Sequence, residues 1–200
     1  QSNAATVTRP AQLTLTFTPA ADAYVDSANP ALNYGNSTTL KADASPDVQS
    51  FLRFTLQGVN GTVTSAKLRV FASNGSSTGY QVYTLTDNTW TETGVIYTNR
   101  PGTGSQVAAS GTFALGGVWT EADLTSLVSG NGQLDVALKT TSSTSISMNS
   151  REGANPPQLV VTITAGSGPT STPTSTPTAG PSPTPTSTST PTSTPTPVTS

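Results

Sequence analysis

The residues that could do chemistry in this sequence are few, because only eight of its 200 residues are basic, ten are acidic, and none is histidine or cysteine. Aromatic side chains stand out against that background. A tyrosine or tryptophan ring can stack on the C–H faces of a sugar, and a guanidinium can bind its hydroxyl or carboxylate groups. We therefore predict carbohydrate binding by five residues, with packing inside the fold as the alternative: Tyr34, Trp90, Tyr97, Arg100 and Trp119.

Six charged side chains form a second group of interest. A charge-poor domain that buries an arginine must pair it with a carboxylate, so partly buried ion pairs are the first interpretation. The alternative is an arginine cluster that binds the carboxylates of an acidic polysaccharide. The residues concerned are Arg53, Glu92, Arg100, Asp123, Arg151 and Glu152.

Oxygen-bearing side chains also gather near the N-terminus, at Asp22, Asp26, Asn29 and Asn33. Calcium prefers hard oxygen ligands of this kind, and we predict these four residues as its ligands in a structural site. Their spacing does not match an EF-hand, and Asp and Asn also form ordinary turns. No cofactor is required by any other feature of the sequence.

The same composition argues against several functions. Without histidine or cysteine there is no ordinary catalytic triad and no thiol nucleophile, and nothing in the spacing of the acidic residues selects a catalytic pair. We therefore predict that the protein is not an enzyme. A net charge of −2 gives no basic surface for nucleic acid, and no apolar run is long enough to span a membrane.

The elements that must position these side chains are strands. Apolar residues alternate with polar ones, whereas no long window has a helical period; residues 121–128 could form at most a turn or two of helix. Glycines that follow asparagine should supply the positive φ of tight turns, at Asn60-Gly61, Asn74-Gly75 and Gly130-Asn131-Gly132. The predicted fold is all-β, an antiparallel β-sandwich of jelly-roll type, and an immunoglobulin sandwich is the nearest alternative. The alternating segments are residues 13–17, 52–56, 66–72, 134–139 and 159–163.

Three parts follow from this pattern: an extended arm at 1–12, the sandwich at 13–165 and a tail at 166–200. Of the 32 residues from Pro169 to Ser200, 29 are Pro, Thr or Ser, which predicts a polyproline-II-like stalk with O-glycosylation, or else a plain linker. The arm could complete the sheet of a neighbouring copy. The predicted O-glycosylation sites are Thr170, Thr172, Thr174, Thr176, Thr178, Thr184, Thr186, Thr188, Thr190, Thr192, Thr194 and Thr196.

Eight short phrases occur in an order that resembles the DNRLRE domain, a disaggregatase-related family that is also classed as a carbohydrate-binding module family. The resemblance covers about residues 20–164. It implies an extracellular β-sandwich, often attached to polysaccharide-active or cell-surface proteins, that is not itself catalytic. Among the phrases are Ala21-Asp22-Ala23-Tyr24-Val25, Asn33-Tyr34-Gly35, Ser50-Phe51-Leu52-Arg53-Phe54, Trp90-Thr91-Glu92, Tyr97-Thr98-Asn99-Arg100-Pro101 and Ser150-Arg151-Glu152-Gly153.

Together these features predict a secreted β-sandwich module whose partner is a polysaccharide or a cell-surface glycan. The chain begins with Gln1-Ser2-Asn3-Ala4, without methionine or an apolar leader, and we expect this to be the N-terminus of a mature secreted protein. The alternative is a structural subunit of a glycosylated extracellular filament. Its copies would be joined by strand addition through the N-terminal arm and coated by the tail.

Overall fold

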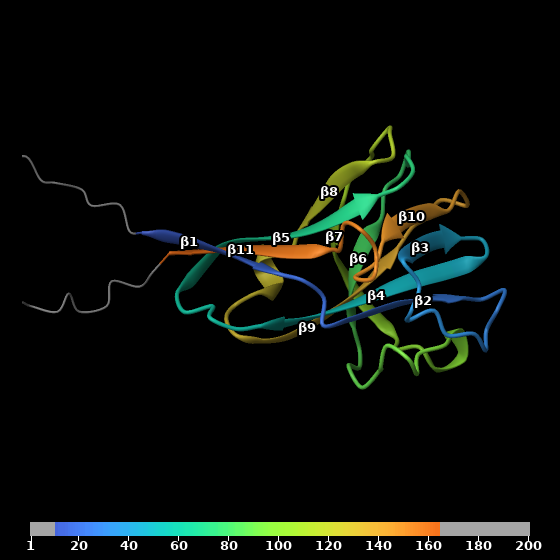
Figure 1. Ribbon diagram of the computed structural model, residues 1–200, viewed down its shortest axis with the longest axis horizontal. Coiled ribbons are helices and arrows are strands. Elements are labelled where there is room, and N and C mark those ends of the chain that lie inside the picture. The colour runs from blue at the N-terminus through green and yellow to red at the C-terminus, as the bar shows by residue number, and fades with distance from the viewer. Residues whose placement is uncertain (1–10, 165–200) are drawn as a thin grey trace, which may run out of the picture. The chain divides into compact units, whose positions relative to one another are not determined.

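The computed structural model describes residues 11–164, and the regular elements of this part of the chain are antiparallel strands, apart from two short 3-10 turns at Tyr97–Asn99 and Thr125–Leu127 (Figure 1). The first sheet contains β1 (Gln12–Phe17), β3 (Thr39–Ala44), β5 (Thr62–Ala72), β8 (Val118–Asp123), β10 (Ile146–Asn149) and β11 (Gln158–Thr164). The second contains β2 (Ala21–Asp26), β4 (Asp47–Leu56), β6 (Gln81–Leu85), β7 (Thr103–Ala109) and β9 (Gly132–Lys139). The sheets are joined at one corner, where β3 pairs with β4.

This arrangement confirms the predicted all-β antiparallel sandwich. Within residues 11–164 no helix is long and apolar enough to cross a membrane. The predicted polyproline-II-like tail, its threonines and nearly all of the N-terminal arm lie outside the described residues.

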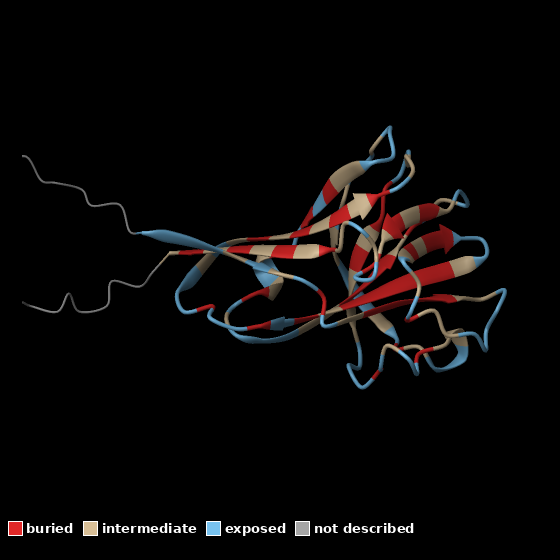
Figure 2. Ribbon diagram, viewed as in Figure 1, coloured by how far each residue is buried: buried red, intermediate tan, exposed pale blue. Residues whose placement is uncertain are grey.

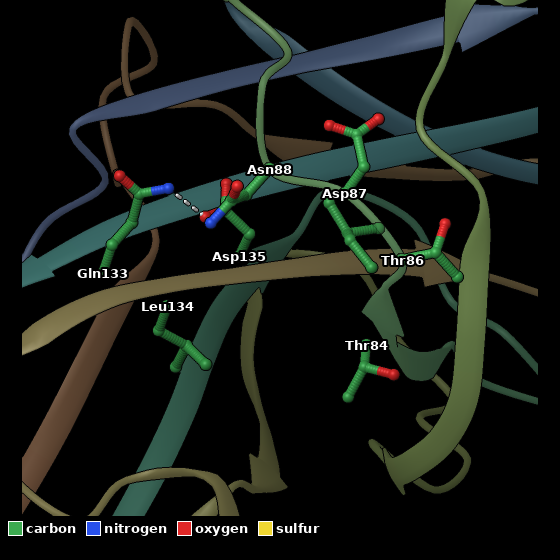
Figure 3. Close-up of a pocket in the computed structure, with 8 residues that line it drawn as sticks. Thr84, Thr86, Asp87, Asn88, Gln133, Leu134 and Asp135 are labelled. Atoms are coloured by element: carbon green, nitrogen blue, oxygen red, sulfur yellow. Dashed lines mark hydrogen bonds between the residues drawn. The ribbon is translucent and has the colours of Figure 1, made fainter.

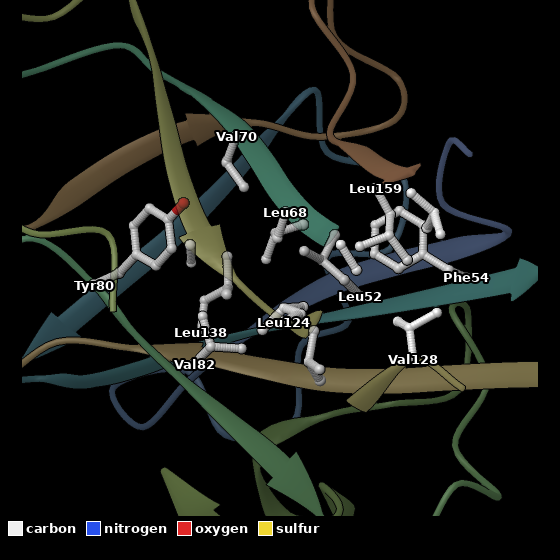
Figure 4. Packing of buried hydrophobic residues seen from close by; sticks show 14 of the residues in the cluster. Leu52, Phe54, Leu68, Val70, Tyr80, Val82, Leu124, Val128, Leu138 and Leu159 are labelled. Atoms are coloured by element: carbon white, nitrogen blue, oxygen red, sulfur yellow. The ribbon is translucent and has the colours of Figure 1, made fainter. Parts of the chain in front are cut away.

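The main core lies between the two sheets, where alternate residues of facing strands meet (Figure 4). Leu52 and Phe54 of β4 and Leu68 and Val70 of β5 are completely buried, as the alternating pattern predicts. The hydroxyl of Tyr80 is buried with them and lies 3.0 Å from the hydroxyl of Thr120. Burial raises the pKa of Tyr80, so this phenol stays neutral and serves as a hydrogen-bonding group inside the core.

One local prediction is wrong in part. Among the glycines expected to supply positive φ, Gly132 does so, but Gly61 and Gly75 do not; the turn after β4 uses Gly58 instead. The segment 121–128 keeps within the expected limit of a turn or two of helix: its first three residues belong to β8, and a three-residue 3-10 turn (Thr125–Leu127) follows. Pairing with β5 extends β8 through Asp123 and so confines the helical part to that turn.

Strand β4 departs from simple alternation because both of its faces are buried in its middle part (Figure 2). A second apolar cluster covers the outer face of the second sheet. It is formed by Ala23, Val25, Phe51 and Ala137 of the strands together with Trp90 and Val95. The last two belong to the long connection between β6 and β7, residues 86–102, which we call the cover segment. The cover segment is what positions the predicted binding residues Tyr97 and Arg100.

Candidate functional site

Apolar contacts and a buried ion pair fix the first half of the cover segment to the sheet. The rings of Trp90 and Phe51 lie 5.9 Å apart between centroids. The Asp135 carboxylate accepts hydrogen bonds from Arg53 Nε at 2.7 Å and from Trp90 Nε1 at 2.8 Å. The Arg53 guanidinium also lies over the Trp90 ring and donates to the carbonyls of Trp90 and Asn88. Arg53 and Asp135 therefore hold the cover segment through both the Trp90 ring and the segment's backbone carbonyls.

Asparagine side chains and a close glycine contact fix the second half. Asn33 Nδ2 donates to the carbonyls of Glu92 at 2.8 Å and Val95 at 2.7 Å, and its Oδ1 accepts from the Gly35 backbone. Gly35 passes so close to the cover segment that a Cβ there would overlap the Glu92 carbonyl. Within the segment, Asn99 Oδ1 accepts from the Ile96 N–H at 2.8 Å. The backbone leading to Arg100 is thus held by side-chain hydrogen bonds rather than by a strand ladder.

At the end of the cover segment, Tyr97 and Arg100 form a joint unit over the sheet. The Arg100 guanidinium carbon lies 3.7 Å from the centroid of the Tyr97 ring, and Arg100 Nη1 donates to the Tyr97 carbonyl at 2.6 Å. The Tyr97 hydroxyl donates to Asp47 Oδ2 at 2.8 Å. That hydrogen bond is the main reason why the pKa of Tyr97 is raised, with burial and the negative charge of Asp47 adding to it.

Arg100 borders a polar groove of about 360 Å³ on the outer face of the second sheet. The other charged lining residues are Asp47 and Lys139, and Gln49 donates to Asp47 Oδ2 at 2.8 Å. The acceptor capacity of Asp47 is therefore used largely by donors of the protein itself. The groove is lined by Asp47, Gln49, Arg100, Pro101, Gly102, Thr103 and Lys139, and we call it the Arg100 groove.

A second hollow, of about 350 Å³, lies where β6 separates from β9 and is lined by residues 84–88 and 133–135 (Figure 3). Its buried acid, Asp135, is already engaged by Arg53 and Trp90 and accepts a further hydrogen bond from Gln133. The remaining lining is Thr, Leu, Asp87 and Asn88. With no cation on its wall, this hollow is less suited than the Arg100 groove to bind an acidic ligand.

Three carboxylates meet at one side of the cover segment. One oxygen each of Asp22, Glu92 and Glu152 lies within 4.8 Å of the others. Arg151 partly balances them: its Nη1 is 3.3 Å from Glu92 and its Nε is 2.9 Å from Glu152. The Arg151 backbone N–H donates to Asp22 Oδ2 at 2.7 Å. Three acids around one arginine leave negative charge, which either a proton or a divalent cation such as calcium could neutralise.

The structure changes the predicted calcium ligands. Only Asp22 belongs to this acidic cluster, at the start of β2. Asp26, at the other end of that strand, accepts hydrogen bonds from Ala28 and Asn29 in a local turn. Asn33 holds the cover segment. The four predicted ligands are therefore not gathered around one point, because Asp22 and the turn at Asp26 lie at opposite ends of strand β2.

The predicted sugar-binding residues are also divided among different places. Trp90 is 6% exposed and packs in the second apolar cluster, so its ring offers no open face to a sugar. Tyr34 stacks on Tyr24 at 4.2 Å, beside β2. Trp119 lies on the first sheet, edge-on to Phe71 and under the guanidinium of Arg69. The structure brings together only Tyr97 and Arg100, and these define the candidate site.

The sequence alone did not identify Gln49 and Lys139 as groove residues. Lys139 follows Leu138 on an alternating strand, a pattern that predicts a solvent-facing lysine but not its neighbours. Gln49 is 4% exposed although it is polar, because the cover segment lies beside it. The only signal for these two residues in the sequence was that each is a long polar side chain in a strand, and that a loop with charged residues could lie beside them.

The acidic cluster leads to a prediction about pH. Burial, with the nearby charges of Glu152 and Glu92, raises the pKa of Asp22 to about 7, against the lowering effect of the Arg151 N–H. The folded protein thus binds this proton more tightly than the unfolded chain, so the stabilisation is complete below about pH 4 and is lost as the pH rises towards 7. With calcium chelated, a shift from pH 8 to pH 5 should stabilise the protein by about 2 kcal/mol more than its Asp22→Asn variant.

Urea denaturation of both proteins at the two pH values measures this difference. Equal pH dependence of the two proteins would contradict the assignment of the proton to Asp22. A second comparison repeats the urea denaturation at pH 8 with excess calcium. A bound cation would hold Asp22 ionised and reduce its pH dependence, and it would have no such effect on the Asp22→Asn variant.

The second sheet carries a polar groove that is bordered by a stacked tyrosine and arginine. Such a groove on an antiparallel β-sandwich is typical of a module that binds a ligand on one sheet face. The chain matches carbohydrate-binding module family 96 over residues 13–163 and belongs to that family. No curated protein matches the chain. Membership confirms the predicted carbohydrate-binding module-like domain.

Proposed function

We propose that this domain is a secreted, non-catalytic module that holds an acidic polysaccharide in the Arg100 groove. The observation that carries the proposal is the state of the three charged groups there. Asp47 already accepts from Tyr97 and Gln49 and also lies 3.9 Å from Arg100 Nη2, so the N–H groups of Arg100 and Lys139 together outnumber what this one carboxylate can accept. The groove wall carries two cations, Arg100 and Lys139, and one carboxylate, Asp47. The groove is therefore positively charged, although the chain as a whole has a net charge of −2.

The geometry of Arg100 favours a carboxylate or sulfate group on the sugar. Stacking on Tyr97 fixes the guanidinium plane, so the N–H groups of Arg100 that are not used by the Tyr97 carbonyl and by Asp47 are held in place for an anion. Lys139, on the neighbouring strand β9, supplies a second point charge that tolerates variation in the ligand. Catalysis by the groove itself is disfavoured, because glycoside hydrolysis ordinarily needs two carboxylates and the groove wall has one.

The test is binding of the full chain to a uronic-acid polysaccharide and to a neutral glucan, measured by affinity gel electrophoresis and calorimetry. Arg100→Ala and Lys139→Ala should each weaken binding of the acidic polymer by roughly tenfold, and Arg100→Lys should recover only part of that loss. Lys67→Ala is the matched control, since Lys67 is an exposed cation on the first sheet, paired with Asp123. Unchanged binding in both groove variants would refute the site.

The extracellular location belongs to the same proposal and rests on composition. The body of the domain has no cysteine, and the segment after Pro169 is dominated by Pro, Thr and Ser. Mass analysis of that peptide from the natural source tests the proposed O-glycosylation, and an unmodified mass would refute it.

A structural subunit of an extracellular filament is the second candidate. The observation in its favour is that β1, the strand continuous with the N-terminal arm, lies at an edge of the first sheet. Electron microscopy of the native protein would distinguish regular fibres from dispersed modules.

A further inference from the structure

Asp47 borders the Arg100 groove and uses only one of its two carboxylate oxygens within the protein. Its Oδ2 accepts hydrogen bonds from the Tyr97 hydroxyl and from Gln49 Nε2, both at 2.8 Å, and Arg100 Nη2 lies 3.9 Å from the same atom. No residue within the described range 11–164 donates a hydrogen bond to Oδ1 of Asp47. Because an ionised carboxylate accepts through both oxygens, Oδ1 keeps its capacity for a donor from outside the protein.

The second oxygen is also accessible and held in place. The side chain of Asp47 is 34% exposed, that of Arg100 is 30% exposed, and both residues line the groove. The two hydrogen bonds on Oδ2 fix the carboxylate plane, so Oδ1 cannot simply turn away from a ligand. A ligand that displaces water from Oδ1 must return a hydrogen-bond donor to it or lose binding free energy.

The groove therefore presents a negatively charged acceptor beside its two cations. The N–H groups of Arg100 and Lys139 suit an anionic group, whereas Oδ1 of Asp47 suits a hydroxyl and repels a second anion. A uronic acid residue offers both partners, because its ring carries one carboxylate and free hydroxyl groups. A heavily sulfated sugar carries negative charges in place of those hydroxyls, and one of these charges would face Asp47.

We propose that Asp47 is the specificity-determining residue of the Arg100 groove and selects hydroxyl-bearing uronic acid polymers against heavily sulfated ones. This rests on the proposed function, because it takes an acidic polysaccharide as the ligand of the groove. In the complex, Arg100 and Lys139 bind the carboxylate of one sugar, and Oδ1 of Asp47 accepts from a hydroxyl of the same ring or the next. Selection comes from the penalty on a ligand that repels Asp47 or leaves it without a donor.

Calorimetry of the full chain with two short oligosaccharides of equal length, one of uronic acid and one heavily sulfated, tests the selection. In Asp47→Asn the amide oxygen stays with the donors of Tyr97 and Gln49, which turns the amide NH2 towards the ligand. The ratio of the uronic acid affinity to the sulfated affinity should therefore fall by at least about tenfold. An unchanged ratio would overturn the proposal.

Asp123→Asn is the matched control for the loss of one negative charge. Asp123 lies on the first sheet, and its side chain is 57% exposed. This variant should keep the ratio of the two affinities, because water and salt screen a charge that lies outside the groove. A ratio that falls equally in both variants would mean that net charge, and not the position of Asp47, sets the preference.

A second measurement changes the ligand and so does not depend on how well a variant folds. Deoxy analogues of the uronic acid oligosaccharide replace one hydroxyl at a time by hydrogen. For at least one hydroxyl, the loss should weaken binding to the unmodified protein by roughly tenfold and binding to Asp47→Asn far less, since the acceptor is already gone. Equal losses in both proteins at every position would mean that no hydroxyl contacts Asp47.

Tyr97→Phe separates specificity from positioning. It removes the hydroxyl that donates to Asp47 Oδ2 but leaves the charge of Asp47 in the groove. The affinities for both oligosaccharides should fall by similar factors, so their ratio should change far less than in Asp47→Asn. If Tyr97→Phe changes the ratio as much as Asp47→Asn does, Asp47 only supports the neighbouring side chains and the proposal is wrong.

Failure of this proposal and failure of the proposed function are distinguishable. If Arg100→Ala binds both oligosaccharides as the unmodified protein does, the groove is not the binding site and the proposed function fails. If Arg100→Ala weakens binding while Asp47→Asn keeps the ratio of affinities, the ligand occupies the groove and only the role of Asp47 is refuted.

Discussion

Asp135→Ala is expected to lower the free energy of unfolding by about 3–5 kcal/mol, because it breaks a buried ion pair from one side. The Asp135 side chain is 5% exposed and that of Arg53 is 17% exposed. Removal of the carboxylate leaves the Arg53 Nε and the Trp90 indole N–H without their acceptor, beneath the cover segment. Urea denaturation followed by tryptophan fluorescence measures the loss, and Trp90 reports directly on this region.

Glu121→Ala is the matched control for that prediction. Glu121 also pairs with an arginine, Arg69, at 3.1 Å, but its side chain is 54% exposed. An exposed pair of this kind contributes at most about 1 kcal/mol, since water and salt screen it. If the two variants lose similar stability, the cover segment is not anchored by the buried pair. A loss confined to Asp135→Ala and accompanied by weaker polysaccharide binding would link the anchor to the Arg100 groove.

Gly35→Ala has the next largest expected effect, a loss of about 2–3 kcal/mol, from crowding rather than from charge. A Cβ at Gly35 would overlap the Glu92 carbonyl, a backbone atom that cannot turn aside as a side chain could. The cover segment must therefore lift away from the chain at Gly35, and the hydrogen bonds that Asn33 donates to it are weakened. Thermal and urea unfolding both measure this effect.

Gly130→Ala is the control, because a Cβ there meets nothing within 4 Å and the residue does not have a positive φ. Its stability should change by no more than about 0.5 kcal/mol. Equal melting of Gly35→Ala and the unmodified protein would mean that the cover segment does not need this close approach. Binding measured on Gly35→Ala adds a functional readout, since Tyr97 and Arg100 lie on the same segment.

The sequence predicted the sandwich well because its main core depends on local alternation. The side chains of β5 at Ala66, Leu68, Val70 and Ala72 fall on one face by geometry alone, and all four are buried. Strand β4 shows the limit of that argument. From the two-residue alternation alone, the face that carries Phe51 is expected to point to solvent, but it is buried under Trp90 and Val95. The covering residues come from a loop some forty positions away, which period cannot reveal.

The partly buried ion pairs were predicted as a class, but their partners were not. Arg53 finds Asp135, which is 82 positions away, and Arg151 finds Glu92 as well as its neighbour Glu152. Asp22 was predicted as a metal ligand with its sequence neighbours, yet its companions in the fold are Glu92 and Glu152. Charge pairing is a property of distance in space, and the composition could state only that burial demands partners.

By itself, then, the sequence determined an all-β sandwich, the core face of each alternating strand and a small set of aromatic and charged side chains suited to sugars. Those features depend on backbone period and residue type, which act locally. Only the tertiary structure decided that Trp90 is an anchor and that Tyr97 and Arg100 share a groove with Lys139. These outcomes depend on how the cover segment folds back over the second sheet, and that path is set by long-range contacts with Asp135, Asn33 and Gly35.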